Sequence, residues 1–336
     1  MITDNTTNAS GCACNFSPTL AYLRSTMYLI AYYIIVPIYF FLGMFGQSIL
    51  LIAFKKQSKI DKAYAYQVFA AISKILENIA YTLSIASRKW WSGLECVGVE
   101  WFEKSYPLMW YTARLAAPTV NVFITSSFLF SLAMSADRVL ALSKPFLYKN
   151  LNHRFYQNFT ATGCFFVGLV TSLFDCFRFI VVPTDNQIYR IEVDQVYVAS
   201  LIAISLSYVR NIIRIVGVLS LIGLNINMAV AFRRRHRKVA QMTTAGDQND
   251  QARRKADKTL LLLAAWQSVL TCVEMLPLLG YYFLVYMSPS FSVCLSTVML
   301  PFVDAVIYIT DTADFFVVLA INRKIRDMIF GVLKCR

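Results

Sequence analysis

Seven long apolar runs decide what kind of fold this chain can form. They cover residues 28–54, 63–86, 106–139, 155–181, 200–232, 257–286 and 292–320. A helix needs about 20 predominantly apolar residues to cross the hydrocarbon core of a bilayer, and every run is at least that long. Composition agrees, because 57% of the residues are hydrophobic and only 15% are charged, whereas soluble domains are about 25% charged. The sequence therefore predicts an all-α protein, with a bundle of seven transmembrane helices in residues 28–320.

The basic residues predict how this bundle is oriented in the membrane. Most of the 32 lysines and arginines lie in four stretches: 55–62, 138–154, 233–258 and the tail after Asn322. These stretches share one side of a seven-helix bundle, and positively charged connections stay in the cytoplasm. We therefore expect a cytoplasmic C-terminus and an extracellular N-terminus. The net charge of +13 is spread between apolar runs, which argues against a nucleic-acid partner.

Both ends of the chain carry patterns that fit this orientation. Residues 1–27 contain three glycosylation sequons, at Asn5, Asn8 and Asn15, which predict a glycosylated extracellular segment on a plasma-membrane protein.

The other end, residues 321–336, has apolar residues at helical spacing between basic ones: Ile325, Met328, Ile329, Val332 and Leu333. This pattern predicts a short amphipathic helix lying on lipids of the inner leaflet. Cys335 is a candidate palmitoylation site; the alternative is an unmodified cysteine.

The end of the third run carries the motif that relates this chain to a family. The phrase "SLAMSADRVLALSKPFLY" has Asp137 and Arg138, with Pro145 eight residues after the aspartate. It resembles the end of the third helix in rhodopsin-like (class A) G-protein-coupled receptors. The phrases "AYAYQVFAAIS", "RIVGVLSLIGLNINMA" and "CVEMLPLLG" are similar to invertebrate neuropeptide receptors and nematode chemosensory-type receptors. The resemblance implies a cell-surface receptor for an extracellular peptide or small molecule that signals through a heterotrimeric G protein.

The resemblance also implies a resting contact at the cytoplasmic end. Asp257 lies 20 residues before Pro277, at the position that pairs with the arginine of the third helix in the family. We expect Arg138 to pair with Asp257 at rest and to release it on activation. The alternative is that Asp257 only balances the neighbouring cations of a solvated helix end.

Several motifs of the family are altered here. Its Asn-Pro-x-x-Tyr motif is "DFFVV", from Asp314 to Val318, and its Cys-Trp-x-Pro motif is "EMLP". The family's disulfide is missing too, since Ala113 stands at its first position and residues 182–199 contain no cysteine. The remaining extracellular candidates are a pairing of Cys96 with Cys12 or Cys14, or three free thiols.

A lysine inside an apolar run calls for a buried partner. Lys74, in "AISKILENI", would cost about 2.5–3.5 kcal/mol at the bilayer centre if unpaired. Asp304, Asp311 and Asp314 share one face of the seventh run, and the resemblance puts Lys74 where the family has a sodium-binding carboxylate. We therefore predict a Lys74 pair with Asp311 or Asp314 in place of the sodium site. Glu77 is a competing partner; snorkelling, or a water-filled cavity, is the alternative.

Charges nearer the outside suggest a ligand pocket. Arg210 and Arg214 lie one turn apart on the fifth run and are suited to an acidic ligand group. Two acids are suited to a basic group instead: Glu274 and Asp304. The alternative is internal pairing, as in Arg214 with Glu274 or Arg178 with Asp175.

The sequence lacks the patterns of catalysis. It shows no nucleophile beside a base, no metal-ligand cluster and no phosphate-binding glycine loop, so we expect no enzyme, no metal and no cofactor. Intramembrane charges are also typical of transporters and channels, although no internal repeat supports that reading. The altered motifs fit a third alternative, a non-signalling relative of the receptors.

Overall fold

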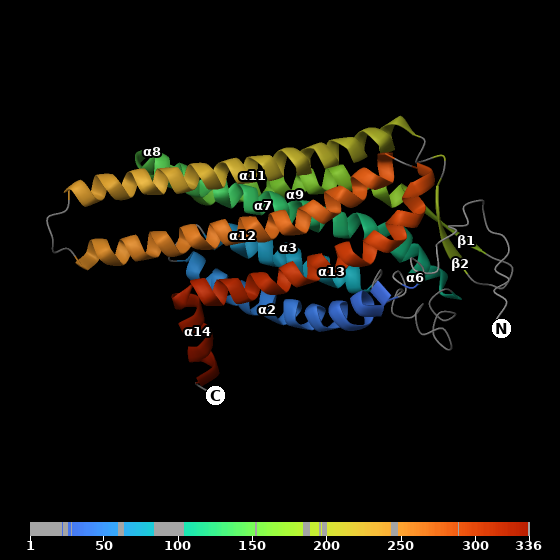
Figure 1. The fold of residues 1–336 in the computed structure, drawn as a ribbon, viewed down its shortest axis with the longest axis horizontal. Helices are drawn as coiled ribbons and strands as arrows, with labels where there is room; N and C mark the ends of the chain where they lie inside the picture. The colour runs from blue at the N-terminus through green and yellow to red at the C-terminus, as the bar shows by residue number, and fades with distance from the viewer. Residues whose placement is uncertain are drawn as a thin grey trace.

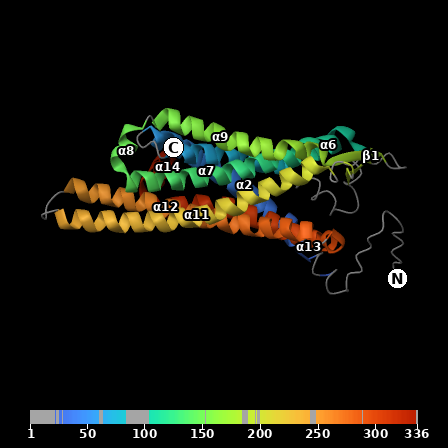
Figure 2. The same cartoon turned by 90° about the horizontal axis from the view of Figure 1, so that it is seen from above.

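The computed structural model consists almost entirely of helices that run side by side, with a small hairpin at one end (Figures 1 and 2). It describes residues 29–59, 64–83, 104–151, 153–183, 189–194, 200–242, 248–287 and 289–334, with isolated positions 22, 26, 27 and 196.

The long helices correspond to the predicted apolar runs. In chain order they are α2 (Val36–Ser58), α3 (Ala65–Tyr81), α7 (Ala117–Ser143), α9 (His153–Leu173), α11 (Leu201–Met242), α12 (Gln248–Met287) and α13 (Pro289–Ile321). The shorter helical elements are η1 (Ile30–Ile35), α6 (Tyr106–Tyr111), η4 (Thr112–Ala116), α8 (Pro145–Asn150), η5 (Phe174–Phe177) and α14 (Arg323–Lys334).

Within the described residues, five segments are long and apolar enough to cross a membrane: Ile30–Ser58, Tyr106–Ser143, Phe155–Phe177, Tyr208–Arg234 and Leu261–Tyr281. Large apolar side chains such as Phe41, Ile52 and Leu219 point outward and are exposed, while many charged side chains are buried. An apolar exterior around a polar interior is typical of a multi-pass membrane protein. The predicted helical, membrane-compatible fold is therefore confirmed at this level.

Helix α7 lies in the middle of the bundle. It packs against α3, α9, α11 and α12, while α2 packs against both α3 and α13. The remaining neighbours among the long helices are α3 with α9, α9 with α11, α11 with α12, and α12 with α13. The contacts between successive long helices thus close into a ring, and α7 also contacts α11 and α12 across it.

The all-α prediction needs one correction. Strand β1 (Phe179–Pro183) pairs antiparallel with β2 (Tyr189–Val193), with Phe179 opposite Val193. The fourth apolar run was expected to stay helical to residue 181, but α9 ends at Leu173. The run "FIVV" is rich in β-branched residues, which favour a pleated strand once a partner strand is present.

The basic connection predicted at residues 233–258 is mostly helical. Helix α11 continues to Met242, and α12 already begins at Gln248. Arginine, lysine and glutamine have high helix propensity, and neither proline nor glycine occurs between residues 233 and 245. The cations expected on a loop therefore lie largely on two helical extensions.

The tail helix forms as predicted, but part of its apolar face contacts protein. Helix α14 turns away from the bundle axis at the end opposite the hairpin (Figure 1), and Ile325 is buried against Leu50 and Phe54 of α2. Asn322 fixes this turn: its Oδ1 accepts from the Ile325 backbone N–H at 3.2 Å, and its Nδ2 donates to the Tyr64 hydroxyl at 2.8 Å. The first turn is thus anchored to the bundle, whereas Phe330 is exposed.

Close packing of α9 on α7 depends on a glycine. A Cβ atom on Gly168 would lie 2.6 Å from Ser126 Oγ and 2.8 Å from the Val122 carbonyl oxygen, and a backbone atom cannot move aside alone. We expect Gly168→Ala to destabilise the protein by about 1–3 kcal/mol, measured as a lower melting temperature in detergent. Gly163→Ala on the same helix is the control, because nothing lies within 4 Å of its Cβ position. Equal melting temperatures for the two variants would contradict the close approach.

Candidate functional site

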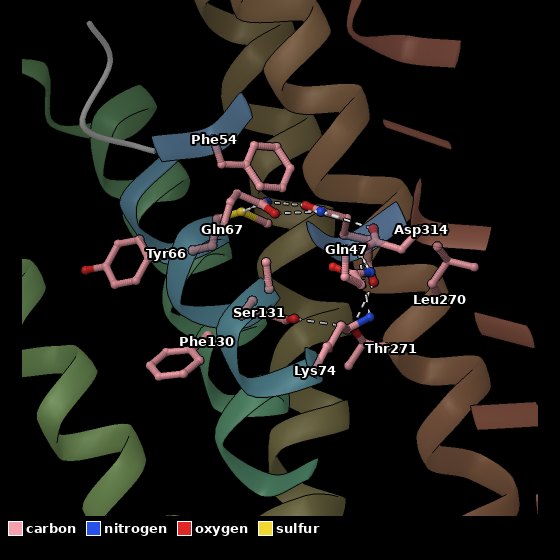
Figure 3. Close-up of a pocket in the computed structure, with 14 residues that line it drawn as sticks. Gln47, Phe54, Tyr66, Gln67, Lys74, Phe130, Ser131, Leu270, Thr271 and Asp314 are labelled. Atoms are coloured by element: carbon pink, nitrogen blue, oxygen red, sulfur yellow. Dashed lines mark hydrogen bonds and ion pairs between the residues drawn. The ribbon is translucent and has the colours of Figure 1, made fainter. Parts of the chain in front are cut away.

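Lys74 contacts both of its predicted partners, and Figure 3 shows it close to one of them, Asp314. Its Nζ is 2.8 Å from Asp311 Oδ1 and 3.8 Å from Asp314 Oδ2. The lysine side chain is 13% exposed and that of Asp311 only 1%. Asp311 is therefore the principal partner. No ion pair joins Lys74 to the competing acid, Glu77, among the residues that the structure describes.

Side-chain amides from three helices hold the two carboxylates in place. Gln47 Nε2, on α2, donates to Asp314 Oδ2 at 3.4 Å and to the Asp311 carbonyl oxygen at 3.0 Å. Asn78 Nδ2, on α3, donates to Asp311 Oδ2 at 3.2 Å. Gln267 Nε2, on α12, donates to Asp314 Oδ1 at 3.2 Å. These donors matter because the desolvation of a buried ion pair is offset only when additional hydrogen bonds satisfy its remaining oxygens.

The network continues from the ion pair to the central helix. Gln67 and Gln267 are joined through their side-chain amides, and Gln67 Nε2 also contacts Met134 Sδ on α7 at 2.6 Å. Hydroxyl groups link α7 to α12 at two further points, Ser131 with Thr271 and Ser135 with Ser268, each at 3.3 Å. We call the whole set the polar seam: Gln47, Gln67, Lys74, Asn78, Ser131, Ser135, Gln267, Ser268, Thr271, Asp311 and Asp314.

A small cavity lies within the polar seam (Figure 3). Its volume is about 20 Å³, and its lining includes Lys74, Gln67, Gln267 and Asp314. That space holds about one water molecule and is too small for a peptide or an organic ligand. Lys74 therefore has both an acidic partner and a polar cavity beside it.

Sequence reasoning missed the amides that complete this site. Gln67, Gln267 and Asn78 are uncharged, so a search for intramembrane charges passes over them. A signal was present nevertheless, because each amide interrupts an apolar run: "AYQVF", "AWQSV" and "ENIAY". Buried amides in hydrocarbon need partners as charges do, and a search for them would have found the seam.

The outer arginines are buried and bound inside the protein. Arg210 and Arg214 are 1% and 0% exposed. Arg210 Nη1 forms an ion pair with Asp175 Oδ2, and Arg214 Nη2 donates to Thr125 Oγ1 at 3.1 Å and to Asn121 Oδ1 at 3.3 Å. The internal-pairing alternative holds in this conformation.

The particular partners that the sequence suggested were wrong. Asp175 pairs with Arg210 of α11 and not with Arg178, whose guanidinium lies 5.4 Å from the centre of the Phe179 ring. The short turn η5 directs Asp175 inward, where α11 packs, while Arg178 continues into the hairpin. Arg214 donates to α7, and no ion pair joins it to Glu274 within the described part of the chain.

The acidic ligand candidates are also enclosed. Glu274 and Asp304 are both buried, and the Tyr32 hydroxyl donates to Asp304 Oδ2. Tyr81 and Tyr308 pack edge-to-face near Asp304, with ring centroids 5.5 Å apart. All four ligand candidates therefore lie within the packed interior in this conformation.

At the other end of α7, Asp137 has a partner that the sequence did not suggest. The carboxylate is buried and accepts a hydrogen bond from the Tyr148 hydroxyl of α8 at 3.0 Å. Arg138 follows it and is partly exposed. Asp257 lies on α12, but its side chain is outside the described residues, so the predicted pair with Arg138 stays a prediction.

Other predicted sites also fall outside the described residues: Asn5, Asn8, Asn15, Cys12, Cys14, Cys96 and Cys335. The three cysteines whose side chains the structure describes, Cys164, Cys176 and Cys272, form no disulfide.

Comparisons with known proteins add no relative. No protein-family model matches the chain, and a search of curated proteins finds no match. A functional proposal therefore depends on the geometry above and on the motif resemblance.

Proposed function

We propose that this chain is a seven-helix receptor of the rhodopsin-like class in the plasma membrane, with its N-terminus outside and its C-terminus in the cytoplasm. An extracellular peptide or small molecule would be its ligand, and a heterotrimeric G protein its cytoplasmic partner. In this arrangement α3 and α13 complete the set of seven spans.

One observation carries the proposal: the polar seam joins five helices through the bundle centre, and α7 carries both part of the seam and the Asp137–Arg138 pair. A receptor needs a contiguous element with two discrete arrangements that ligand and partner can both bias. The hydroxyl groups of α7, the amide and hydroxyl groups of α12 and the carboxylates of α13 can exchange hydrogen-bond partners at little net cost in free energy, because each broken hydrogen bond is replaced by another. Arg138 would then present donors to a partner at the cytoplasmic end.

The order of helix packing supports the same proposal. Helices that are neighbours in the chain are neighbours in the ring, and α13 closes the ring on α2. In place of the family's sodium site stands the ion pair of Lys74 with Asp311 and Asp314. Sodium-dependent regulation is therefore not part of the proposed function.

The test is ligand-dependent nucleotide exchange on G proteins, with a library of amidated peptides and small molecules applied to cells expressing the full chain. Once a ligand is found, we expect Arg138→Ala to reduce the exchange rate at least tenfold at equal surface expression, because one charge-assisted contact of about 1.5–3 kcal/mol is lost. Lys144→Ala, an exposed cation at the same end of the bundle, is the control and should exchange normally.

The rival functions predict different outcomes. Substrate-dependent flux in reconstituted vesicles, without nucleotide exchange, would favour a transporter or channel. Ligand binding without exchange on any G protein would favour a non-signalling relative. Asp257→Ala adds a separate test: increased basal exchange would support a resting Arg138–Asp257 pair, and unchanged basal exchange at normal expression would count against it.

A further inference from the structure

Acids outnumber cations in the centre of the bundle. The charged groups that interact there are Lys74 and Arg214 on one side and Glu77, Glu274, Asp311 and Asp314 on the other. Asp311 and Asp314 have Lys74 and several amide donors, as described above. Among the residues that the structure describes, no ion pair joins Glu77 or Glu274 to Lys74 or Arg214.

One of these acids, Glu77, is deeply buried and incompletely hydrogen-bonded. It lies on α3 one turn beyond Lys74, is 3% exposed, and its Oε2 has no hydrogen-bond partner among the described residues. The titratable groups that face it are Lys74 on its own helix, Arg214 on α11, Glu274 on α12, and Asp311 and Tyr308 on α13. A second glutamate is thus among its neighbours, while Lys74 is already paired.

A proton is the ligand that suits this arrangement. An ionised carboxylate without a partner in a low-dielectric interior costs several kcal/mol, and neighbouring negative charges disfavour its ionisation further. A metal ion would need several oxygen ligands around a cavity, and the described residues contain no cluster of three or more potential ligands that could hold one. A proton needs no cavity.

We propose that Glu77 is a proton-binding site, which holds a proton while the bundle is packed as described here. Release of this proton places a second negative charge beside Asp311 and competes for Lys74. Because Asp311 and Lys74 belong to the polar seam, the ion pair that joins α3 to α13 becomes linked to pH. The inference requires neither a ligand nor a G protein, so its failure and that of the receptor proposal can be distinguished.

The first experiment measures the melting temperature of the purified full chain in lipid nanodiscs at a series of pH values. The folded protein holds a proton that the unfolded chain releases near neutral pH, so stability should fall as pH rises. Glu77→Gln carries a neutral amide in place of the protonated carboxyl. We expect it to melt higher than the wild type at alkaline pH and to lose most of the pH dependence.

Two controls make the result specific. Asp327→Asn removes an exposed acid on α14 and should leave the pH dependence unchanged. Infrared spectroscopy of the wild type should show a carbonyl band from a protonated carboxylic acid at neutral pH, which is missing in Glu77→Gln or, if that variant fails to fold, in Glu77→Met. A wild type without such a band, or a Glu77→Gln variant with the full pH dependence of the wild type, would overturn the proposal.

Discussion

Replacing Lys74 with methionine should destabilise the protein by about 3–5 kcal/mol, although methionine is better suited than lysine to an apolar helix. The reason is that Asp311, 1% exposed and 2.8 Å from the ammonium, is left as a buried charge without its cation. Removing one partner of a buried ion pair is far more damaging than removing both. The measurement is the melting temperature in detergent, together with the yield of monodisperse protein.

The same argument predicts which second substitutions restore the stability lost in a Lys74 variant. Adding Asp311→Leu to Lys74→Met removes the orphaned charge and should recover most of the loss. Exchanging the charges, as Lys74→Asp with Asp311→Lys, should recover more than the exchange with Asp314→Lys, because Asp314 lies 3.8 Å away. Lys55→Met, at an exposed position near the end of α2, is the control and should change stability by less than about 0.5 kcal/mol. Equal behaviour of the Asp311 and Asp314 exchanges would contradict the assigned partner.

The ion pair could be predicted from the sequence because Lys74 had few possible partners. A lysine in an apolar run must find an acid, and the seventh run offers aspartates along one face. The positions of the long helices followed equally well from the apolar runs, since the hydrocarbon thickness sets the minimum length of a run that crosses it. In both cases a large free-energy penalty excludes the other arrangements: an unpaired charge in one case, and a segment too short to cross the membrane in the other. Such penalties can be recognised from a single sequence.

Features that depend on smaller free-energy differences did not follow from the sequence. The β1–β2 hairpin forms because a partner strand is nearby, which local propensity cannot show. Helix α11 continues past its apolar run because basic residues are good helix formers, even though the same residues mark a cytoplasmic connection. The amides Gln67 and Gln267 pair across helices far apart in the chain, so neither position alone identifies its partner.

The partner of Asp175 shows directly what sequence alone cannot predict, because sequence proximity and three-dimensional packing point to different arginines. Proximity favours Arg178, three residues away, whereas the structure joins Asp175 to Arg210 of α11. Arg210→Met should therefore cost about 3–5 kcal/mol, since a buried carboxylate loses its cation. Arg178→Met should cost much less, because this partly exposed guanidinium lies over the Phe179 ring.

A double-mutant cycle separates the pair from general damage to the bundle. If Asp175 and Arg210 form the pair, Asp175→Asn should be nearly neutral in the Arg210→Met background and clearly destabilising in the wild type, which gives a coupling energy of about 0.5–3 kcal/mol. The corresponding cycle with Arg178→Met should give a coupling near zero. A larger coupling energy with Arg178 than with Arg210 would show that the Asp175 carboxylate faces the hairpin. Helix α11 would then lack its ion pair with the segment that follows α9.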